Sequence, residues 1–220
     1  MRESYGAGRV LEFAGGGGTL HLHALPESEI RHPCDLEGAS IGIPDSASVL
    51  LLGVRRMLLK SSCDVEEIWL KFLSVENRLD ALLSGQIQAA AFVEPWSSEA
   101  RSAGATSTFQ LDGSLCSRCA VGVIASRREW AEANAETLSR FDDAFARATA
   151  LSNDSETAFR AELVACCALG IEEAADIAMP LWTEDQSGLR DAVHDMMSVM
   201  REDGAGLGTL SAEDFLLGAS

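Results

Sequence analysis

Two short segments combine polar side chains with the points where apolar strands should end. The first, Ile43–Ser48, reads IPDSAS and opens a helix directly after a short apolar run. The free amide groups and the dipole at a helix N-terminus favour a negative group, and Ser46 and Ser48 add hydroxyls. Asp45 or Ser46 is the expected helix cap. The segment therefore indicates either a cap alone or a cap that also contacts an anionic ligand.

The second segment, Ala90–Trp96, reads AAFVEPW and predicts a buried strand that stops at a carboxylate, a proline and a tryptophan. Open α/β sheets bind ligands at the carboxyl edges of their strands. Pro95 suits the first turn of a helix, Glu94 can cap that helix or bind a ligand amine, and Trp96 can form a flat wall beside a ligand. A plain strand-to-helix turn explains Pro95, but it gives Trp96 no packing partner.

A third candidate, Arg118, lies in the loop LDGSLCSRC, which follows the next predicted strand. Its guanidinium can pair with an anion near the same sheet edge. A solvated loop arginine is the plainer interpretation.

Metal and redox chemistry receive little support from the cysteines and histidines. The chain has six cysteines but is long enough to need no disulfide framework. Cys116 and Cys119 form one CxxC pair without a second, and no second ligand pair accompanies the nearby group of His21, His23, His32 and Cys34. We expect Cys166 and Cys167 to pack as small apolar residues. No metal site and no cofactor are predicted.

Covalent catalysis also lacks a sequence signal. The chain contains no GxSxG, no HExxH, no phosphate-binding P-loop and no GxGxxG after a strand. Glu94 is the single evident acid or base near the expected cleft. A non-catalytic binding protein is therefore favoured over an enzyme.

Composition limits the class of protein. The chain has 220 residues, of which 47% are hydrophobic and 23% charged, so we expect a packed core in one domain or two lobes. The net charge of −17 argues against nucleic acid and anionic lipid as partners. No run of 18 apolar residues predicts a membrane span. The N-terminus has no signal-peptide pattern, which as it stands predicts a cytoplasmic protein.

The order of elements predicts an α/β fold with a parallel sheet and covering helices. Residues 127–203 are almost wholly helical and contain the methionine stripe Met196, Met197 and Met200, which we interpret as core filler. The predicted strands are 20–25, 39–43, 68–73, 87–93, 106–111 and 120–125, and the predicted helices between them are 46–60, 74–84 and 96–104.

Three segments, in this order, resemble type II periplasmic binding proteins of ABC importers. They read LPESEIRHPCDLEGASIGIPDSAS, ENRLDALLSGQIQAAAFVEPW and AVGVIASRREWAEANAETLSRFDDAF. The nearest branch is the one that binds alkanesulfonates, taurine, nitrate or a thiamine-precursor pyrimidine. The resemblance runs from about residue 15 to the C-terminus and implies two lobes with a small polar or anionic ligand clamped between them.

The resemblance also implies roles for particular residues. Ser46, Ala47 and Ser48 match the loop that holds the ligand, Glu94–Trp96 match the cleft edge, and Gly16–Thr19, including Gly17 and Thr19, match the crossing from the first lobe. Residues 1–34 then form a hinge and first-lobe remnant, 35–126 the second lobe, and 127–220 the helices that return to the first lobe. Family members carry a further βαβα unit before this point, so we expect an incomplete first lobe.

The implied partners are a small-molecule ligand and an ABC transporter permease, at an extracytoplasmic location; a homo-oligomer could supply the missing half. Two alternatives stay open at this point. One is a cytosolic enzyme on the same fold, of the menaquinone or thiamine-pyrimidine type. The other is a ligand-sensing regulatory domain. Fold analogy alone does not choose among them.

Overall fold

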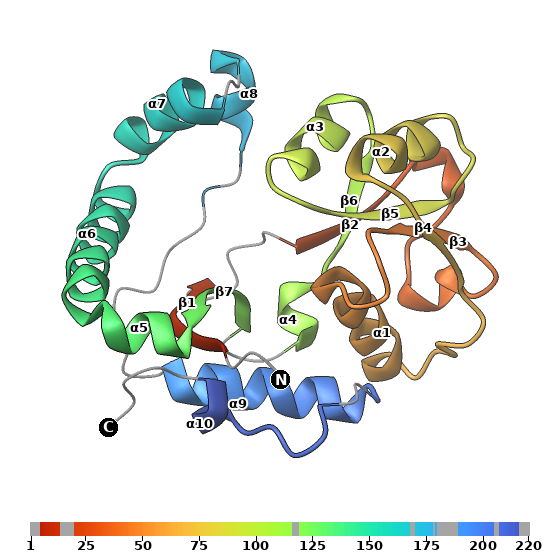
Figure 1. Cartoon of the computed structure of the whole chain (residues 1–220). Helices are drawn as coiled ribbons and strands as arrows, with labels where there is room; N and C mark the ends of the chain where they lie inside the picture. Colours follow the sequence, from red (N-terminus) through yellow and green to blue (C-terminus); the bar gives the residue numbers. More distant parts are fainter. Residues whose placement is uncertain are drawn as a thin grey trace. The chain divides into compact units, whose positions relative to one another are not determined.

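The structure, a computed structural model, describes residues 5–13, 20–115, 119–167, 170–177, 179, 189–204 and 207–215 (Figure 1). The chain forms two compact units. The sheet unit comprises Gly16–Leu115 with Leu163–Met179, and the helical unit comprises Met1–Gly15, Cys116–Glu162 and Pro180–Ser220. The division expected from the sequence, at residues 34 and 126, differs from these boundaries and stays a prediction.

The sheet unit alternates strands and helices, as the sequence predicts. Its elements are β2 (Leu20–Ala24), η1 (Pro26–Ser28), η2 (Pro33–Leu36), β3 (Ser40–Ile43), α1 (Val49–Lys60), β4 (Trp69–Phe72), α2 (Val75–Leu83), β5 (Ala89–Val93), α3 (Trp96–Ser102), β6 (Thr106–Gln110), α4 (Asp112–Leu115) and α8 (Ile171–Asp176). The boundary with the helical unit falls within α7 (Glu156–Cys167).

The five strands of the sheet unit lie in the order β4-β3-β5-β2-β6. β3 pairs in parallel with both β4 and β5, whereas β2 is antiparallel to β5 and β6. The sheet is therefore mixed, with β2 as the reversed strand. The strands predicted at 39–43, 68–73 and 87–93 pair in parallel as expected, whereas the strand at 20–25, expected in the first-lobe remnant, lies antiparallel in the same sheet. The strand predicted over 120–125 also lies elsewhere: it is β7 (Cys119–Arg127) of the helical unit.

Helices cover both faces of this sheet: α1 lies against one face, and α2 and α3 lie against the other (Figure 1). Side chains alternate across a sheet, so each strand contributes to two apolar layers. Leu22, Ile41, Ile43 and Phe92 are completely buried. Gly42 is needed where α2 approaches β3, because a Cβ there would lie 2.7 Å from Arg78 Cγ.

The helix starts show which hydroxyls act as caps. Ser74 Oγ accepts from the Asn77 amide at 3.4 Å and caps α2, as predicted. The cap of α1 is Ser48, whose Oγ accepts from the Leu50 amide at 3.2 Å, so the prediction of Asp45 or Ser46 is wrong. The reason is that the Asp45 carboxylate accepts from the Ala47 amide at 2.7 Å, which forms a turn before the helix begins.

The cysteines depart from expectation. Cys34, within η2, forms a disulfide with Cys63, which follows α1. No spacing signal predicts this pair, because the two residues are 29 positions apart and only the fold brings them together. Cys166 is exposed rather than packed in a core, and the side chain of Cys167 lies outside the described part of the chain.

The helical unit contains a two-stranded antiparallel sheet of β1 and β7, in which Tyr5 lies opposite Arg127 and Phe13 opposite Cys119. Its elements are β1 (Tyr5–Phe13), β7, α5 (Arg128–Ala133), α6 (Ala135–Asp154), α9 (Leu189–Glu202) and α10 (Ala212–Phe215). β1 was not predicted, because YGAGRVLEF holds two glycines and no regular alternation.

Met196 and Met197 are buried on α9, and Met197 packs with Val193 and Ala212 in a small core, so the interpretation of the methionines as core filler is confirmed for these two. Within the described residues, no helix combines the length and apolar character that a membrane crossing needs.

Candidate functional site

The two polar segments singled out in the sequence leave the sheet at neighbouring positions. β3 and β5 are adjacent and parallel, with Ile41 opposite Ala89 and Gly42 opposite Ala90. Both strands therefore end at the same edge, which places the loop 44–48 beside the turn 94–96. We call the residues 44–48 and 94–96 together the carboxyl-edge site.

In the loop 44–48, the hydroxyl of Ser46 is the group available to a ligand. Ser46 and Ala47 are exposed, and Ser48 is half-buried. The Ala47 amide is already bonded to Asp45, and the Ser48 hydroxyl to Leu50. The Ser46 hydroxyl makes no hydrogen bond to any residue that the structure describes. It lies just before the N-terminus of α1, a 12-residue helix, where an anionic group is favoured.

Glu94 is engaged within the protein. Its Oε2 accepts from the Ser98 amide at 3.1 Å, so it caps the first turn of α3, one of the two roles expected of it. Its Oε1 lies 3.4 Å from both terminal nitrogens of Arg101, and its side chain is 9% exposed. A ligand amine would have to compete with Arg101 for this carboxylate.

Trp96 has the packing partner that the sequence left unassigned. The side chain is half-buried and packs against the apolar cluster beneath α2 and α3, which includes Leu79, Leu82 and Phe92. Trp96 therefore closes one end of this core layer at the carboxyl edge. Only its remaining exposed part is available to a ligand.

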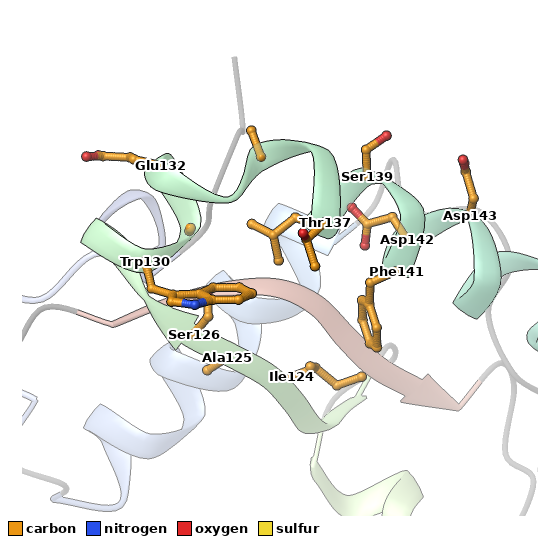
Figure 2. Close-up of a pocket in the computed structure, with 13 residues that line it drawn as sticks. Ile124, Ala125, Ser126, Trp130, Glu132, Thr137, Ser139, Phe141, Asp142 and Asp143 are labelled. Atoms are coloured by element: carbon orange, nitrogen blue, oxygen red, sulfur yellow. The ribbon is translucent and has the colours of Figure 1, made fainter.

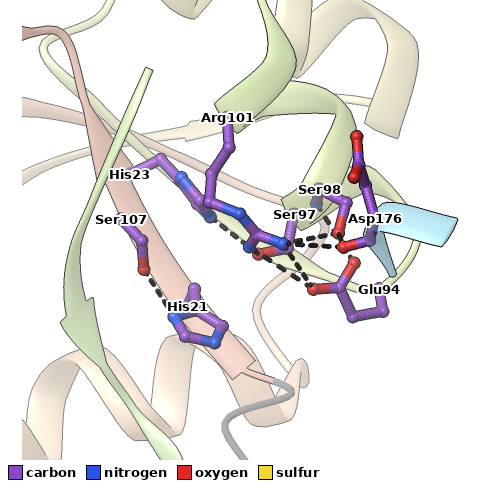
Figure 3. A network of polar contacts seen from close by, with 8 residues as sticks. All are labelled: His21, His23, Glu94, Ser97, Ser98, Arg101, Ser107 and Asp176. Carbon is purple, nitrogen blue, oxygen red and sulfur yellow. Dashed lines mark hydrogen bonds and ion pairs between the residues drawn. The ribbon is translucent and has the colours of Figure 1, made fainter. Parts of the chain in front are cut away.

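Arg101 organises a polar network that sequence analysis missed (Figure 3). It donates to Ser97 Oγ at 3.0 Å, to Ser98 Oγ and to the Asp176 carbonyl at 3.4 Å. Ser98 also donates to that carbonyl, at 2.8 Å. The available signal was the i, i+4 spacing of Ser97 and Arg101 on α3. The network joins α3 to α8 and holds the Glu94 carboxylate in place.

Two histidines of β2 continue this network into the sheet (Figure 3). His23 Nε2 lies 2.9 Å from Ser97 Oγ, and His21 Nδ1 lies 2.6 Å from Ser107 Oγ. His23 is completely buried, and burial, followed by the charges of His21 and Arg101, lowers its pKa to about 3. His23 is therefore neutral at physiological pH. Its Nδ1 has no hydrogen-bond partner among the described residues.

The histidines do not gather further metal ligands around them. Among the residues that the structure describes, the one group of three possible ligand atoms is Cys34, Glu37 and Cys63. The remaining predicted ligand contacts, Gly17, Thr19 and Arg118, lie outside the described residues.

A separate pocket of about 640 Å³ lies in the helical unit, between β7, α5 and the start of α6 (Figure 2). Its wall is largely apolar and includes Ile124, Trp130 and Phe141. Figure 2 shows the two aromatic rings facing this space, while the carboxylate of Glu132 points away from them. None of the residues predicted to bind ligand lines this pocket. It is therefore a second possible location for a ligand, in competition with the carboxyl-edge site.

A match to a protein-family model identifies the family of the chain. Residues 28–168 match the model of the NMT1-like family, and the chain belongs to that family. No curated protein sequence shows significant similarity to it.

Solved structures confirm the fold. The alkanesulfonate-binding protein SsuA from Xanthomonas axonopodis pv. citri, bound to MOPS, superposes with a TM-score of 0.77 at 17% identity, over 97% of this chain and 74% of that one. The periplasmic aliphatic sulphonate binding protein SsuA from Escherichia coli gives 0.75 at 15% identity, over 96% and 69%. The desulfurization enzyme DSZB gives 0.72 at 14% identity, over 98% and 77%. The chain thus has the α/β fold of periplasmic binding proteins, as predicted.

Proposed function

We propose that this protein is the solute-binding component of an ABC-type importer and binds a small polar or anionic organic molecule at the carboxyl-edge site. The observation that carries the proposal is the adjacency of the loop 44–48 and the turn 94–96 at the ends of β3 and β5. The comparisons support a ligand-binding role, because binding proteins share this fold over nearly the whole chain.

The chemistry of the loop 44–48 suits the anionic end of such a ligand. Ser46 offers an exposed hydroxyl, and the first amides of α1 offer donors next to it. Ala47 and Ser48 shape this loop through their own hydrogen bonds. A sulfonate, a carboxylate or nitrate would each present the acceptor oxygens that these donors need.

The turn 94–96 supplies the wall of the site. Pro95 fixes the backbone where β5 turns into α3, and Trp96 presents the part of its ring that the core leaves uncovered. Glu94 contributes to the site by pairing with Arg101 and capping α3, and its carboxylate is not free to bind the ligand. Gly17 and Thr19 complete the proposed contacts by resemblance, and Arg118 completes them by its place in the loop after the strand 106–111.

The proposed location is extracytoplasmic, with an ABC permease as the partner. The disulfide between Cys34 and Cys63 supports an oxidising compartment, where such bonds persist. A net charge of −17 disfavours phosphate backbones and anionic lipid surfaces as partners.

A thermal-shift screen of the purified chain tests the proposal. The ligands are taurine, longer alkanesulfonates, nitrate, thiamine-pathway pyrimidines and aromatic acids. A ligand that binds the native state stabilises it and so raises the melting temperature. At a ligand concentration of 100 times the Kd, the free energy of unfolding increases by about 2.7 kcal/mol. We expect a rise with at least one anionic ligand. No rise with any of them, for a chain that melts cooperatively, would contradict the proposal.

An enzyme on the same fold is the second candidate, and the similarity to DSZB is the observation that favours it. The nearest nucleophile-like pair in the sheet unit is Ser97 with His23, but both side chains are completely buried. A substrate would not reach them in this conformation. Mass spectrometry of a bound ligand after incubation distinguishes the candidates, because a binding protein returns it unchanged.

A further inference from the structure

The disulfide of the sheet unit sits in a group of atoms that can ligate a metal ion. Cys34, Glu37 and Cys63 place their ligand atoms within 4.8 Å of one another. The carbonyl of Ser61 lies 3.6 Å from Cys63 Sγ and 3.9 Å from Cys34 Sγ. Asp64, Glu66 and Glu67 follow Cys63 in the sequence. The group thus brings two sulfurs, a carboxylate and a carbonyl together in one place.

Two short turns present these three ligands, and their geometry does not depend on the disulfide alone. Cys34 lies in η2 and Glu37, three residues on, is the residue that follows it, where the Glu37 amide donates to the Cys34 carbonyl at 3.1 Å. Side chains three apart on a 3₁₀ helix lie over one another. Cys63 is held at the end of α1, since its amide donates to the Leu58 carbonyl at 3.0 Å.

Further hydrogen bonds hold the two turns against each other. The Asp64 amide donates to Glu37 Oε1 at 2.8 Å, and the Gly38 amide donates to the Glu67 carbonyl at 2.6 Å. If the disulfide is reduced, these bonds keep the two sulfurs facing each other beside the Glu37 carboxylate. Cys34 and Glu37 are exposed, so an ion and a reductant can both reach the group.

From this arrangement we infer that Cys34, Glu37 and Cys63 form a Zn²⁺ site in the reduced protein. Two thiolates and a carboxylate are ligands that Zn²⁺ accepts in tetrahedral sites, with Zn–S near 2.3 Å and Zn–O near 2.1 Å. Water would take the fourth position. The mixture of soft and hard ligands suits Zn²⁺ better than Mg²⁺ or Ca²⁺, which prefer oxygen alone.

The chemistry balances with a thiol or phosphine reductant. A dithiol supplies two electrons and two protons, which convert the disulfide into two thiols, and it is itself oxidised to a disulfide. A phosphine supplies the two electrons and takes the oxygen of one water molecule to become a phosphine oxide, while the two protons of that water complete the two thiols. Binding of Zn²⁺ then releases the two thiol protons to solvent. The ion would close the same loop, which contains β3, the ligand loop 44–48 and α1, that the disulfide closes in the oxidised protein.

Titration of the full chain with Co²⁺, a spectroscopic substitute for Zn²⁺, tests the inference. After reduction by a phosphine, we expect the near-ultraviolet absorption of thiolate-bound Co²⁺, saturating at about one ion per chain and reversed by Zn²⁺. The oxidised chain should show no such band. Because four other cysteines are also reduced, the Cys116→Ser/Cys119→Ser variant is included and should bind as the wild type does.

Two further variants locate the site. Cys34→Ser/Cys63→Ser should lose the band, and Glu37→Gln should weaken Co²⁺ binding at least tenfold, whereas Glu66→Gln, a nearby exposed control, should change it less than twofold. Circular dichroism checks that each variant is folded. An unchanged band in Cys34→Ser/Cys63→Ser, or no band in the reduced wild type, would overturn the inference. Both outcomes are independent of the proposed solute binding.

Discussion

The two units of the chain bury their apolar residues to very different degrees. In the sheet unit, helices cover both faces of a five-stranded sheet, and Leu22, Ile41, Ile43 and Phe92 have no measurable exposure. In the helical unit, α6 runs for 20 residues and buries only Thr149 among its described side chains, while Phe141 is 41% exposed and Trp130 47%. The β1–β7 sheet has two strands, a size that is marginal without further packing.

This difference indicates where the stability of the protein lies. Hydrophobic burial is the main favourable term in folding, so the sheet unit should carry most of the free energy of unfolding. The helical unit should unfold at a lower free energy than the sheet unit. A single unfolding midpoint then need not describe the whole chain. The proposed site belongs to the better-packed unit, which suits a ligand loop that must be held in place.

The sharpest contrast comes from one phenylalanine in each unit. Phe92→Ala removes a completely buried ring and should lower the free energy of unfolding by about 3 to 5 kcal/mol. Phe141→Ala removes an exposed ring and should change it by about 0.5 kcal/mol. Urea denaturation followed by circular dichroism measures both. Equal losses would contradict the difference between the units.

Removal of the disulfide should act on the sheet unit alone. Cys34 and Cys63 are 29 positions apart, and loop closure over that length stabilises the folded chain by about 3 to 4 kcal/mol. The Cys34→Ser/Cys63→Ser variant, measured without metal, should lose this amount, and a reductant should then have no further effect on it. A wild-type chain whose urea midpoint is the same with and without reductant would contradict the expectation.

The buried His23 makes stability depend on pH. Its pKa is about 3 in the folded protein and near 6.5 when unfolded, so between these values the unfolded chain binds the extra proton. Stability should therefore fall as pH decreases through this window, by about 1.4 kcal/mol per pH unit from His23 alone. Urea unfolding at several pH values measures the slope. His23→Gln should flatten it, while His194→Gln, an exposed residue of the helical unit, should not.

Most of the sheet unit was predictable from the sequence because its local signals agree with its packing. Ser74 with the apolar spacing of α2, and Gly85 with a φ of +72°, mark one helix from start to end. The strand at Ala89–Val93 is recognisable because both its faces are buried and its sequence is uniformly apolar.

The missed features depend on contacts between distant parts of the chain. Nothing near Leu20–Ala24 shows that this strand inserts, reversed, between β5 and β6. Likewise, Arg101 meets the Asp176 carbonyl across 75 positions of sequence, and Cys34 meets Cys63 only because η2 and the end of α1 are opposed. The edge position of the proposed ligand loop was predictable from strand order, but the engagement of Glu94 with Arg101 was not.

The most direct test of solute binding is calorimetric titration of the best anionic ligand from the thermal-shift screen into matched tryptophan variants. Trp96 lies at the carboxyl-edge site and Trp130 lines the pocket of the helical unit. We expect Trp96→Ala, in a variant that still melts cooperatively, to weaken binding at least tenfold, or about 1.4 kcal/mol. Trp130→Ala should retain the wild-type affinity. Wild-type affinity in Trp96→Ala together with loss in Trp130→Ala would contradict the carboxyl-edge site and place the ligand in the other pocket.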